Sequence, residues 1–459
     1  MKNDGAKDME QNPALMQPNG NQQERASGVI TLVLTADNHL GYAALGQHPR
    51  KREQCKQRLR HAFQQAADFA IGQGVDLFVQ AGDLFDTTNP DEQDRSFVAA
   101  HLAQLRQAGI RAFAIGGLHD TPVEALPSLN AGEASAASPA PAPQISFARL
   151  GALHYFEPSP GVSKANAAGE QPLDPVIFDV RGTLVGICGL SVYAGQEGDP
   201  LERVRVESGI ERVAIPLLIL HAPIEGLATA ASLFDIHAQV TRASIVEQSA
   251  FRYILAGYHH TYRHLSIGHC DLIVAGATQH IDFSDPDDEP GFVFLGLAAD
   301  GIRWCKHITV DALQLRRLVV QTTELWPQDK DAAQPGCTAS ILERLRPLCS
   351  DNTLVQLRLE GELTRSQFHQ LDLNHIRQYA EEHCFALAID ESALSFLPEQ
   401  ENIADVPGQP GAPRMDERLS PREELLALAD EWIAAAPDGQ EQQALRITKE
   451  ELLAAFRYI

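Results

Sequence analysis

Aspartate and histidine residues recur at five places along this chain, each directly after a predicted strand. These places are Asp37-Asn38-His39, Gly82-Asp83-Leu84-Phe85-Asp86, Gly117-Leu118-His119-Asp120, His221 and Gly257-Tyr258-His259-His260. Carboxylates mixed with imidazoles suit Mn²⁺, Fe or Zn²⁺ better than Ca²⁺. Two such ions about 3.5–4 Å apart can stabilise both the attacking and the leaving oxygen when a phosphodiester is hydrolysed. The five places therefore predict a metal centre suited to hydrolysis.

The spacing within each place agrees with this chemistry. Asp37 and His39 are two residues apart, so both side chains can point to one side of an extended segment. Asp83 follows a glycine that lets the backbone turn closely, and one carboxylate can bridge two cations. His119 beside Asp120 offers an imidazole that a carboxylate can orient, which suits protonation of a leaving group. Each match is weak by itself, but their occurrence in order at strand ends makes coincidence a poor explanation.

The elements that must position these residues alternate between strand and helix in the first part of the chain. Apolar, β-branched runs predict strands, and apolar residues at helical spacing predict helices. They give strands at 30–36, 76–80 and 111–115, and helices over 53–72 and around 97–105. This order implies parallel strands with helices on the faces of the sheet. Such sheets hold ligands at the carboxyl ends of their strands, where the first three motifs lie.

Between residues 176 and 310 the chain is richer in strands, and His221 and His260 each lie at a strand end. The expected strands are 176–180, 184–189, 217–220, 253–256, 272–275, 292–295 and 302–310. We therefore predict an α/β domain over 29–310, with mixed sheets flanked by helices. An Ala/Pro/Ser-rich stretch at 121–146 interrupts it and predicts a long flexible loop.

The rest of the chain divides into smaller parts. Residues 1–28 are polar and lack the apolar core of a secretory signal, which predicts a disordered tail. Residues 311–400 predict a small α+β unit with one helix at 374–383. A polar, Pro- and Gly-containing linker follows at 401–420, and 421–459 carry a terminal pair of helical segments.

Composition limits the partners. No run of about 18 apolar residues occurs, so no membrane-spanning segment is expected. A net charge of −24 argues against nonspecific adhesion to nucleic acid. Residues 48–60 are a local exception with six Lys or Arg residues, either the solvated face of a helix or a groove beside the metal centre. Seven dispersed cysteines without a CxxC pair predict buried thiols in a reducing cytoplasm rather than disulfides.

The ordered set DxH, GDxxD, G(N)HD, H and GHxH resembles the calcineurin-like metallophosphoesterases, and more narrowly the SbcD-type DNA-repair nucleases. The segment from Gly276 to Phe283 also resembles the one that follows the family's last metal motif. The resemblance covers about 29–400, so 311–400 would be a DNA-binding capping domain. It implies a Mn²⁺-dependent, cytoplasmic, dimeric nuclease that works with an SbcC-type coiled-coil ATPase. The 421–459 segment would dock on that ATPase or pack on the protein's own surface, and a helical dimer interface could lie near 93–108.

The resemblance implies that one metal is held by the DxH residues, the GD aspartate and the last histidine of GHxH. Those residues are all present, as Asp37, His39, Asp83 and His260. We therefore expect one well-formed metal site.

The second metal site of the family is weakened in this sequence. Its ligands would be Asp83, the asparagine of G(N)HD, His221 and the first histidine of GHxH, but this chain has Leu118 and Tyr258 at the asparagine and histidine positions. Leucine cannot ligate, and tyrosine ligates only as phenolate. His259, the neighbour of Tyr258, is a possible substitute.

Three functions are compatible with this pattern. The first is a working DNA exonuclease or endonuclease with one tight and one weak metal, which the retained pair His119 and Asp120 favours. The second is a catalytically degenerate scaffold for DNA or an ATPase, which the loss of two ligands at one metal favours. The third is a phosphoesterase for small substrates, against which the capping unit and the terminal helices argue. We expect the first.

Overall fold

The computed structural model describes most of the chain between residues 28 and 397. The described residues are 28–43, 49–122, 141–157, 171–192, 196–227, 237–281, 283, 285, 288–326, 336–397, 433, 442, 445, 446, 448 and 449. The expected N-terminal tail, the 401–420 linker and nearly all of the 421–459 segment lie outside these ranges. The chain divides into two compact units, Met1–Ala312 and Leu313–Ile459.

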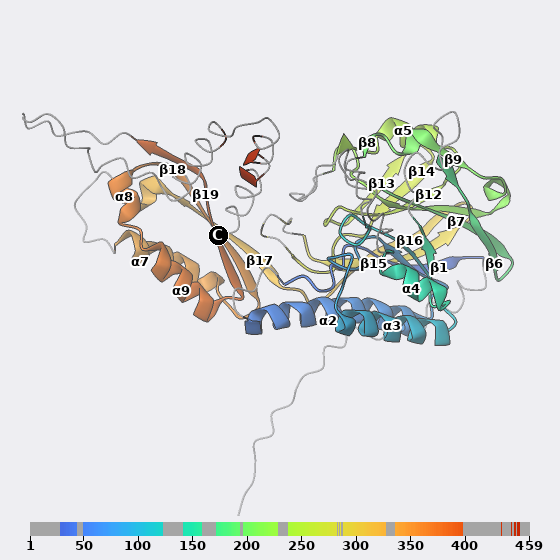
Figure 1. Ribbon diagram of the computed structural model, residues 1–459, viewed down its shortest axis with the longest axis horizontal. Helices are drawn as coiled ribbons and strands as arrows, with labels where there is room; N and C mark the ends of the chain where they lie inside the picture. Colours follow the sequence, from blue (N-terminus) through green and yellow to red (C-terminus); the bar gives the residue numbers. More distant parts are fainter. Residues whose placement is uncertain are drawn as a thin grey trace, which may run out of the picture. The chain divides into compact units, whose positions relative to one another are not determined.

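The first unit contains two six-stranded mixed sheets, which confirms the predicted α/β architecture (Figure 1). The first sheet has the order β16-β15-β1-β2-β3-β4, and the second has the order β13-β14-β12-β10-β7-β6. In the first sheet the strands are β1 (Ile30–Thr35), β2 (Leu77–Ala81), β3 (Arg111–Ile115), β4 (His154–Phe156), β15 (Gly291–Ala298) and β16 (Gly301–Thr309). In the second they are β6 (Val176–Val180), β7 (Thr183–Ser191), β10 (Ile215–His221), β12 (Tyr253–Gly257), β13 (Arg263–Ile267) and β14 (Cys270–Val274).

Both sheets are parallel at their centres and antiparallel at an edge. Strands β1 to β4 run parallel, whereas β15 pairs antiparallel with β1 and β16 with β15. Strands β7, β10, β12 and β14 also run parallel, with β6 and β13 antiparallel at the edges. Because parallel neighbours share a direction, the carboxyl ends of the central strands meet at one edge of each sheet.

The main core lies between the two sheets. Side chains from β1 and β2, including Leu32 and Val79, pack in one cluster with side chains from β10 and β12, including Ile219 and Leu255. Strand β1 is buried along its whole length, which explains its uninterrupted apolar and β-branched sequence. A second apolar cluster covers the other face of the β10–β12–β14 sheet and includes Ile245 of α5 (Arg242–Glu247).

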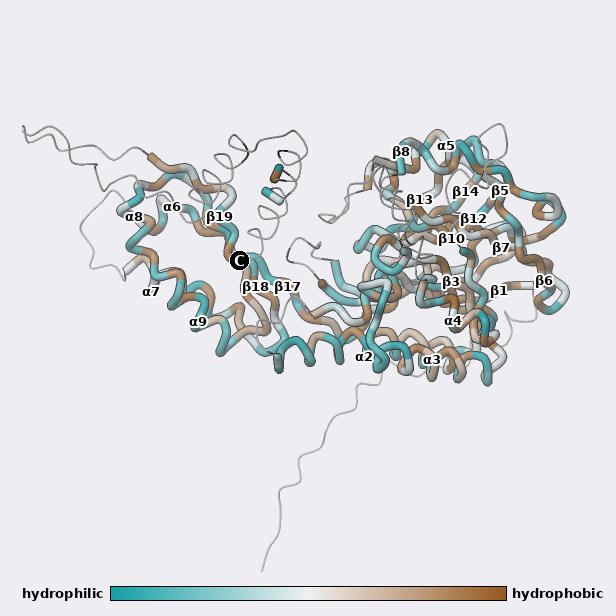
Figure 2. Tube along the Cα trace, in the orientation of Figure 1, coloured by the Kyte–Doolittle hydropathy of each residue, from teal (hydrophilic) through white to brown (hydrophobic). Residues whose placement is uncertain are grey.

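Two helices cover the first sheet and lie side by side (Figure 1). Helix α2 (Pro49–Gln73) buries one face made mostly of small and apolar residues, and helix α3 (Glu92–Gln107) is capped by Asp91, which accepts from the backbone of Asp94 at 2.8 Å. Figure 2 shows hydrophilic and hydrophobic residues alternating along α2, as a one-sided helix requires. The remaining short elements of this unit are α4 (Gln144–Arg149), β5 (Gln171–Leu173), β8 (Glu197–Gly198), η2 (Leu201–Arg203), β9 (Val204–Val206), η3 (Ile210–Arg212) and β11 (His237–Ala238). None of the described helices is long and apolar enough to cross a membrane.

The second unit is a three-stranded parallel sheet with helices. Its order is β17-β18-β19, and α7 and α9 pack in one apolar cluster with the central strand. Its elements are β17 (Gln314–Gln321), α6 (Thr322–Leu325), α7 (Cys337–Leu345), η4 (Arg346–Leu348), β18 (Thr353–Thr364), α8 (Arg365–His369), α9 (Leu373–His383) and β19 (Ala386–Leu397). The expectation of a single helix was wrong, because α7 is short and its apolar face consists only of Ile341, Leu342 and Leu345.

The prediction that the cysteines form no disulfide is also corrected. Cys349 and Cys384 are bonded, with their Cα atoms 4.9 Å apart. They precede β18 and β19, and because these parallel neighbours begin side by side, residues 35 positions apart in sequence meet in space. Of the other cysteines, Cys55, Cys188 and Cys270 are buried free thiols, as expected.

Candidate metal and hydrolytic site

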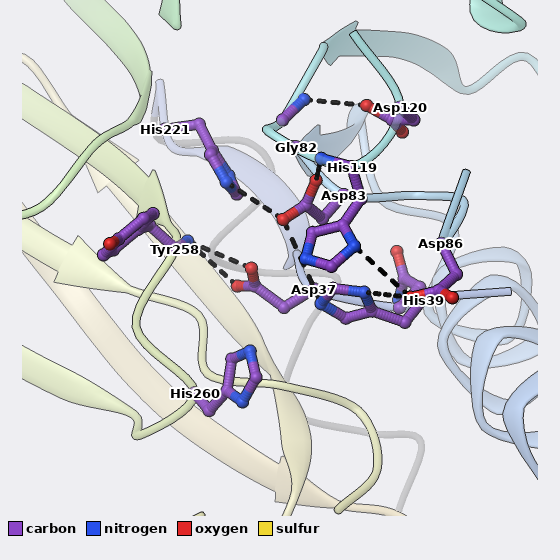
Figure 3. Close-up of polar contacts among 12 residues, drawn as sticks. Asp37, His39, Gly82, Asp83, Asp86, His119, Asp120, His221, Tyr258 and His260 are labelled. Atoms are coloured by element: carbon purple, nitrogen blue, oxygen red, sulfur yellow. Dashed lines mark hydrogen bonds and ion pairs between the residues drawn. The ribbon is translucent and has the colours of Figure 1, made fainter. Parts of the chain in front are cut away.

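The five motifs come together where the central strands of the two sheets end (Figure 3). Asp37 and His39 follow β1, Asp83 follows β2, His221 ends β10 and His260 follows β12. Their ligand atoms form overlapping groups that lie within 4.8 Å of one another, namely Asp37–His39–His260, His39–Asp83–His119 and Asp37–Asp83–His221. The sequence-predicted residues therefore meet in one cluster.

In the first group, carboxylates contact the Nδ1 atoms of both histidines. His39 Nδ1 lies 3.2 Å from Asp86 Oδ1, and His260 Nδ1 lies 2.6 Å from Asp285 Oδ1. His39 Nε2 is buried and has no hydrogen-bond partner, although Asp83 Oδ2 is 4.0 Å away. An imidazole nitrogen left bare among carboxylates, with its other nitrogen fixed by an acid, is the arrangement of a metal ligand. These residues fit a divalent cation.

The second group contains an equally well-oriented histidine. His221 Nδ1 donates to the carbonyl oxygen of Ala81 at 2.8 Å, which turns Nε2 toward Asp83 Oδ2 at 3.2 Å. This nitrogen is also buried without a hydrogen-bond partner. With Nδ1 as the donor, a neutral ring directs its Nε2 lone pair at a carboxylate, so a proton or a metal must lie between them.

The backbone is strained at these ligands. Asp37, His39, Asp83 and Tyr258 have positive φ angles of 48°, 45°, 50° and 81°, and Arg181 is the one other non-glycine residue with positive φ in the described part of the chain. Such conformations cost of order 1–3 kcal/mol each and persist where the surroundings hold them for function. The concentration of this strain in one place supports a functional site.

Glycine is required beside Asp83 because the motifs approach closely. A Cβ at Gly82 would lie 2.2 Å from His221 Nδ1, and a Cβ at Gly117 would lie 2.2 Å from Asp83 Oδ1. The two glycines therefore let the β2, β3 and β10 ends converge.

The charges of the cluster depend on one another. Burial lowers the pKa of His221 and His260, but the negative charges of Asp83 and Asp285 outweigh burial and raise both pKa values to about 9. Burial raises the pKa of Asp83, but the neighbouring histidines outweigh it and hold that pKa well below its usual range. Without metal the histidines therefore carry the positive charge that a bound cation would otherwise supply.

His119 is more exposed than His39, His221 and His260. Its side chain is 25% exposed, its Nδ1 lies 3.4 Å from Asp86 Oδ1, and its ring meets the His39 ring edge-on with centroids 4.6 Å apart. Burial lowers the pKa of His119, but the hydrogen bond to Asp86 and the charges of Asp83 and Asp86 raise it above its ordinary value. A partly exposed, protonated imidazole beside a metal site can donate a proton to a leaving oxygen.

The structure corrects the expected pairing of His119 with Asp120. The Asp120 carboxylate is fully buried and accepts from the backbone of Gly117 at 2.8 Å and of Phe85 at 3.2 Å, and from the side chain of Gln144. Burial and the charge of Asp83 raise its pKa to about 7. Asp120 therefore fixes the loop that carries His119, and Asp86 contacts the imidazole.

Leu118 and Tyr258 turn toward apolar surroundings. Leu118 is 6% exposed and belongs to the apolar cluster on the outer face of the second sheet, and Tyr258 packs against the same cluster. The Tyr258 backbone N–H donates to both Asp37 carboxylate oxygens at 3.1 Å, while Figure 3 shows its hydroxyl on the side away from them. His259 Nε2 accepts from the backbone of Ile224 at 2.9 Å, which gives no support to His259 as a replacement ligand.

Sequence reasoning missed Asp86 and Asp285 as functional residues. Asp86 is the last residue of the GDxxD motif, so the motif itself was a usable signal. Asp285 lies 25 residues after His260, and its Oδ2 accepts from the backbone of Ile281 at 2.8 Å. Nothing in the sequence around Asp285 indicated that contact.

Residues 49–60 of the basic segment form the first half of α2. Lys56 pairs with Asp91 at 2.9 Å, and Arg60 is buried against Asp94 at 2.6 Å. For these two cations the structural explanation holds. Arg50 and Arg52 are exposed.

Comparison with known proteins identifies the family. A model of the calcineurin-like phosphoesterases matches residues 30–168, which include the first three motifs. Over these residues the chain is a calcineurin-like metallophosphoesterase. Within that family it is related to the Mre11/SbcD DNA-repair nucleases.

Several relatives of this metallophosphoesterase have the name DNA double-strand break repair protein Mre11. The protein from Methanosarcina mazei is 36% identical over 92 residues, which are 20% of this chain and 14% of the relative. The one from Sulfurisphaera tokodaii is 32% identical over 84 residues, or 18% and 22% of the two chains. The one from Halobacterium salinarum is 24% identical over 331 residues, or 72% of this chain and 70% of the relative. The match thus spans only a small part of the first two relatives.

Proposed function

We propose that this metallophosphoesterase is a Mn²⁺-dependent DNA nuclease of DNA repair. The observation that carries the proposal is a buried carboxylate–histidine cluster in which the Nε2 atoms of His39 and His221 both face Asp83, beside a partly exposed His119. Asp37, His39, Asp83 and His260 would hold one cation. When bound, such cations stabilise negative charge on phosphate oxygens and activate water.

The residues of the chain would do the rest of the chemistry. His119, whose pKa is raised by Asp86, would give its proton to the leaving oxygen of the phosphodiester. Asp86 would fix the ring orientation of both His119 and His39, because its Oδ1 contacts both Nδ1 atoms. Asp285 would do the same for His260.

The partners follow from the relatives' name and from the motif resemblance. We propose that the substrate is DNA, that the enzyme works in the cytoplasm as a homodimer, and that an SbcC-type coiled-coil ATPase assists it. The Leu313–Ile459 unit would then act as a capping domain. Exposed Arg50 and Arg52 on α2 are candidate phosphate contacts.

A catalytically degenerate scaffold is the second candidate. It is favoured by Leu118 and Tyr258, which pack with an apolar cluster where the family resemblance implies metal ligands. A scaffold for DNA or an ATPase would still need the fold but not the ligand chemistry. A phosphoesterase for small substrates is the third candidate.

The decisive experiment measures degradation of linear double-stranded DNA in Mn²⁺, with the ATPase partner supplied. Asp83→Asn removes the shared ligand, and Asp68→Asn on the exposed side of α2 is the matched control. We expect the wild type and Asp68→Asn to degrade DNA and Asp83→Asn to lose activity. Folded protein that degrades no DNA would overturn the nuclease proposal. Hydrolysis of bis-p-nitrophenyl phosphate without DNA degradation would support the small-substrate alternative.

A further inference from the structure

The two sides of Asp83 differ in what the protein offers a cation. Asp83 Oδ2 faces two buried imidazole nitrogens, 4.0 Å from His39 Nε2 and 3.2 Å from His221 Nε2. On the His39 side, Asp37, His39 and His260 all have ligand atoms within 4.8 Å of one another, and Asp83 is adjacent. That side can bind a cation with two imidazoles and two carboxylates.

The His221 side offers fewer ligands. Among the described residues, the group around His221 consists of that imidazole, Asp83 and Asp37. Both carboxylates belong to the His39 side as well, and Asp37 already accepts from the Tyr258 backbone through both oxygens. A cation here would have one imidazole of its own. Mn²⁺ ordinarily takes about six ligands, so several positions remain for groups outside the protein.

The neighbouring side chains explain why the protein does not fill these positions. Leu118 is buried in the apolar cluster, and the Tyr258 ring packs against that cluster and meets the His221 ring edge-on with centroids 5.7 Å apart. The Tyr258 hydroxyl is directed away from the carboxylates (Figure 3). The remaining ligands of a cation at His221 would therefore be groups from outside the protein, either water or the oxygens of a bound phosphate.

We infer that the His221 side takes up its cation together with the phosphodiester, whose oxygens complete the ligand set, while the His39 side binds its cation without substrate. This inference rests on the proposed function, because it requires a phosphodiester at the site. It makes the second cation and the DNA mutually dependent: each must strengthen the binding of the other by the same factor.

Manganese binding can be measured directly. We would titrate the full-length His119→Ala chain, which should leave the DNA intact, with Mn²⁺ and follow free Mn²⁺ by electron paramagnetic resonance, with and without a short phosphorothioate duplex. The ions bound by the duplex alone are subtracted. We expect one Mn²⁺ per chain without DNA and a second, at least tenfold tighter, once the duplex is added. A His221→Ala, His119→Ala double variant is the matched control and should bind one ion in both conditions.

Two results would overturn the inference. One is the binding of two ions of similar affinity without DNA, and the other is a single ion that persists when the duplex is bound. If the wild type degrades DNA but the His119→Ala chain gains no second ion with the duplex, this inference is overturned and the proposed function stays intact. If the wild type does not degrade DNA and the His119→Ala chain gains no ion, both are overturned.

Restoring ligands provides an independent test. Leu118→Asn with Tyr258→His adds an amide and an imidazole on the His221 side, and histidine tolerates the positive φ of 81° at position 258 better than most residues. We expect this double variant to bind two Mn²⁺ ions without DNA. A folded double variant, judged by its near-ultraviolet circular dichroism, that still binds one ion would show that ligand shortage is not the cause and would overturn the inference. If the variant does not fold, the duplex titration decides alone.

Discussion

Asp86→Asn is the substitution that tests the site most directly. One oxygen of Asp86 lies 3.2 Å from His39 Nδ1 and 3.4 Å from His119 Nδ1. Burial raises the pKa of Asp86, but the hydrogen bonds from the two histidines lower it below its ordinary value, so the carboxylate is charged at neutral pH. The amide keeps the size of the side chain and removes that charge. The variant therefore weakens a proton donor and a metal ligand in one step.

The size of the effect on His119 follows from the distance between His119 Nδ1 and Asp86 Oδ1. Two unit charges 3.4 Å apart interact by about 5 kcal/mol at an effective dielectric constant of about 20. Asp86 and His119 are 23% and 25% exposed, so water screens the pair, and we take about a third, or about 1.5 kcal/mol. Removing that attraction lowers the pKa of His119. Loss of an oriented general acid lowers the rate by about 10²-fold or more.

The assay is DNA hydrolysis as a function of pH at saturating Mn²⁺, together with a Mn²⁺ titration. The active enzyme needs protonated His119, so activity is lost as pH rises through the pKa of His119. We expect Asp86→Asn to move this alkaline limb to lower pH and to reduce the maximal rate about 10²-fold. Since Asp86 also holds His39, the Mn²⁺ affinity should fall about 10- to 100-fold.

A double variant separates the two effects of Asp86. In a His119→Ala background, Asp86→Asn should no longer alter the rate at saturating Mn²⁺, because it acts there through His119, but it should still weaken Mn²⁺ binding. Asp68→Asn controls for the loss of a carboxylate in this unit. An unchanged rate and an unmoved alkaline limb in folded Asp86→Asn at saturating Mn²⁺ would refute the reasoning.

Three further predictions concern metal binding and stability. In the metal-free protein the pKa values of His221 and His260 are raised from 6.5 to about 9, so their contribution to stability is complete below pH 6.5 and is lost as pH rises through about 9. Urea unfolding midpoints should therefore fall over that pH window. Calorimetry near pH 8 should show that Mn²⁺ binding releases protons. Asp285→Asn should weaken Mn²⁺ binding about 10- to 100-fold by calorimetry, because His260 loses the acid that orients it, and unchanged affinity would contradict that role. Asp120→Ala should lower the free energy of unfolding by about 2–4 kcal/mol in urea, because two buried backbone N–H groups lose their acceptor, and an unchanged urea curve would count against a structural role.

The parts of the fold that the sequence predicts best are those set by local pattern. Strand β1 is an unbroken apolar and β-branched run because both of its faces are buried, and Asp37 lies two residues after its end at Thr35. The same logic located β2 and β3 and the ligands that follow them. The convergence of these candidate ligands could be predicted because parallel strands bring their carboxyl ends to one edge of the sheet, which is a property of topology rather than of contacts.

The partners of those ligands depend on contacts that adjacency in sequence does not predict. His119 is next to Asp120 in the chain, yet Asp120 turns toward the loop backbone while Asp86, 33 positions earlier, reaches the ring. Asp285 reaches His260 from a separate loop. Likewise, Cys349 and Cys384 meet only because their strands are neighbours. Long-range packing decides each of these, and no local pattern carries it.

Leu118 and Tyr258 bear on the choice between enzyme and scaffold. Their replacement of polar ligands gives the protein apolar packing on one side of the cluster, which a scaffold would accept. The other residues show no such relaxation: Asp37, Asp83 and His221 are buried ionisable groups, and both aspartates keep positive φ angles. Buried charges and positive φ angles destabilise a fold unless something is gained from them. A scaffold gains nothing from such a cluster, whereas a metal-dependent hydrolase does, so the retained strain and charge favour the enzyme.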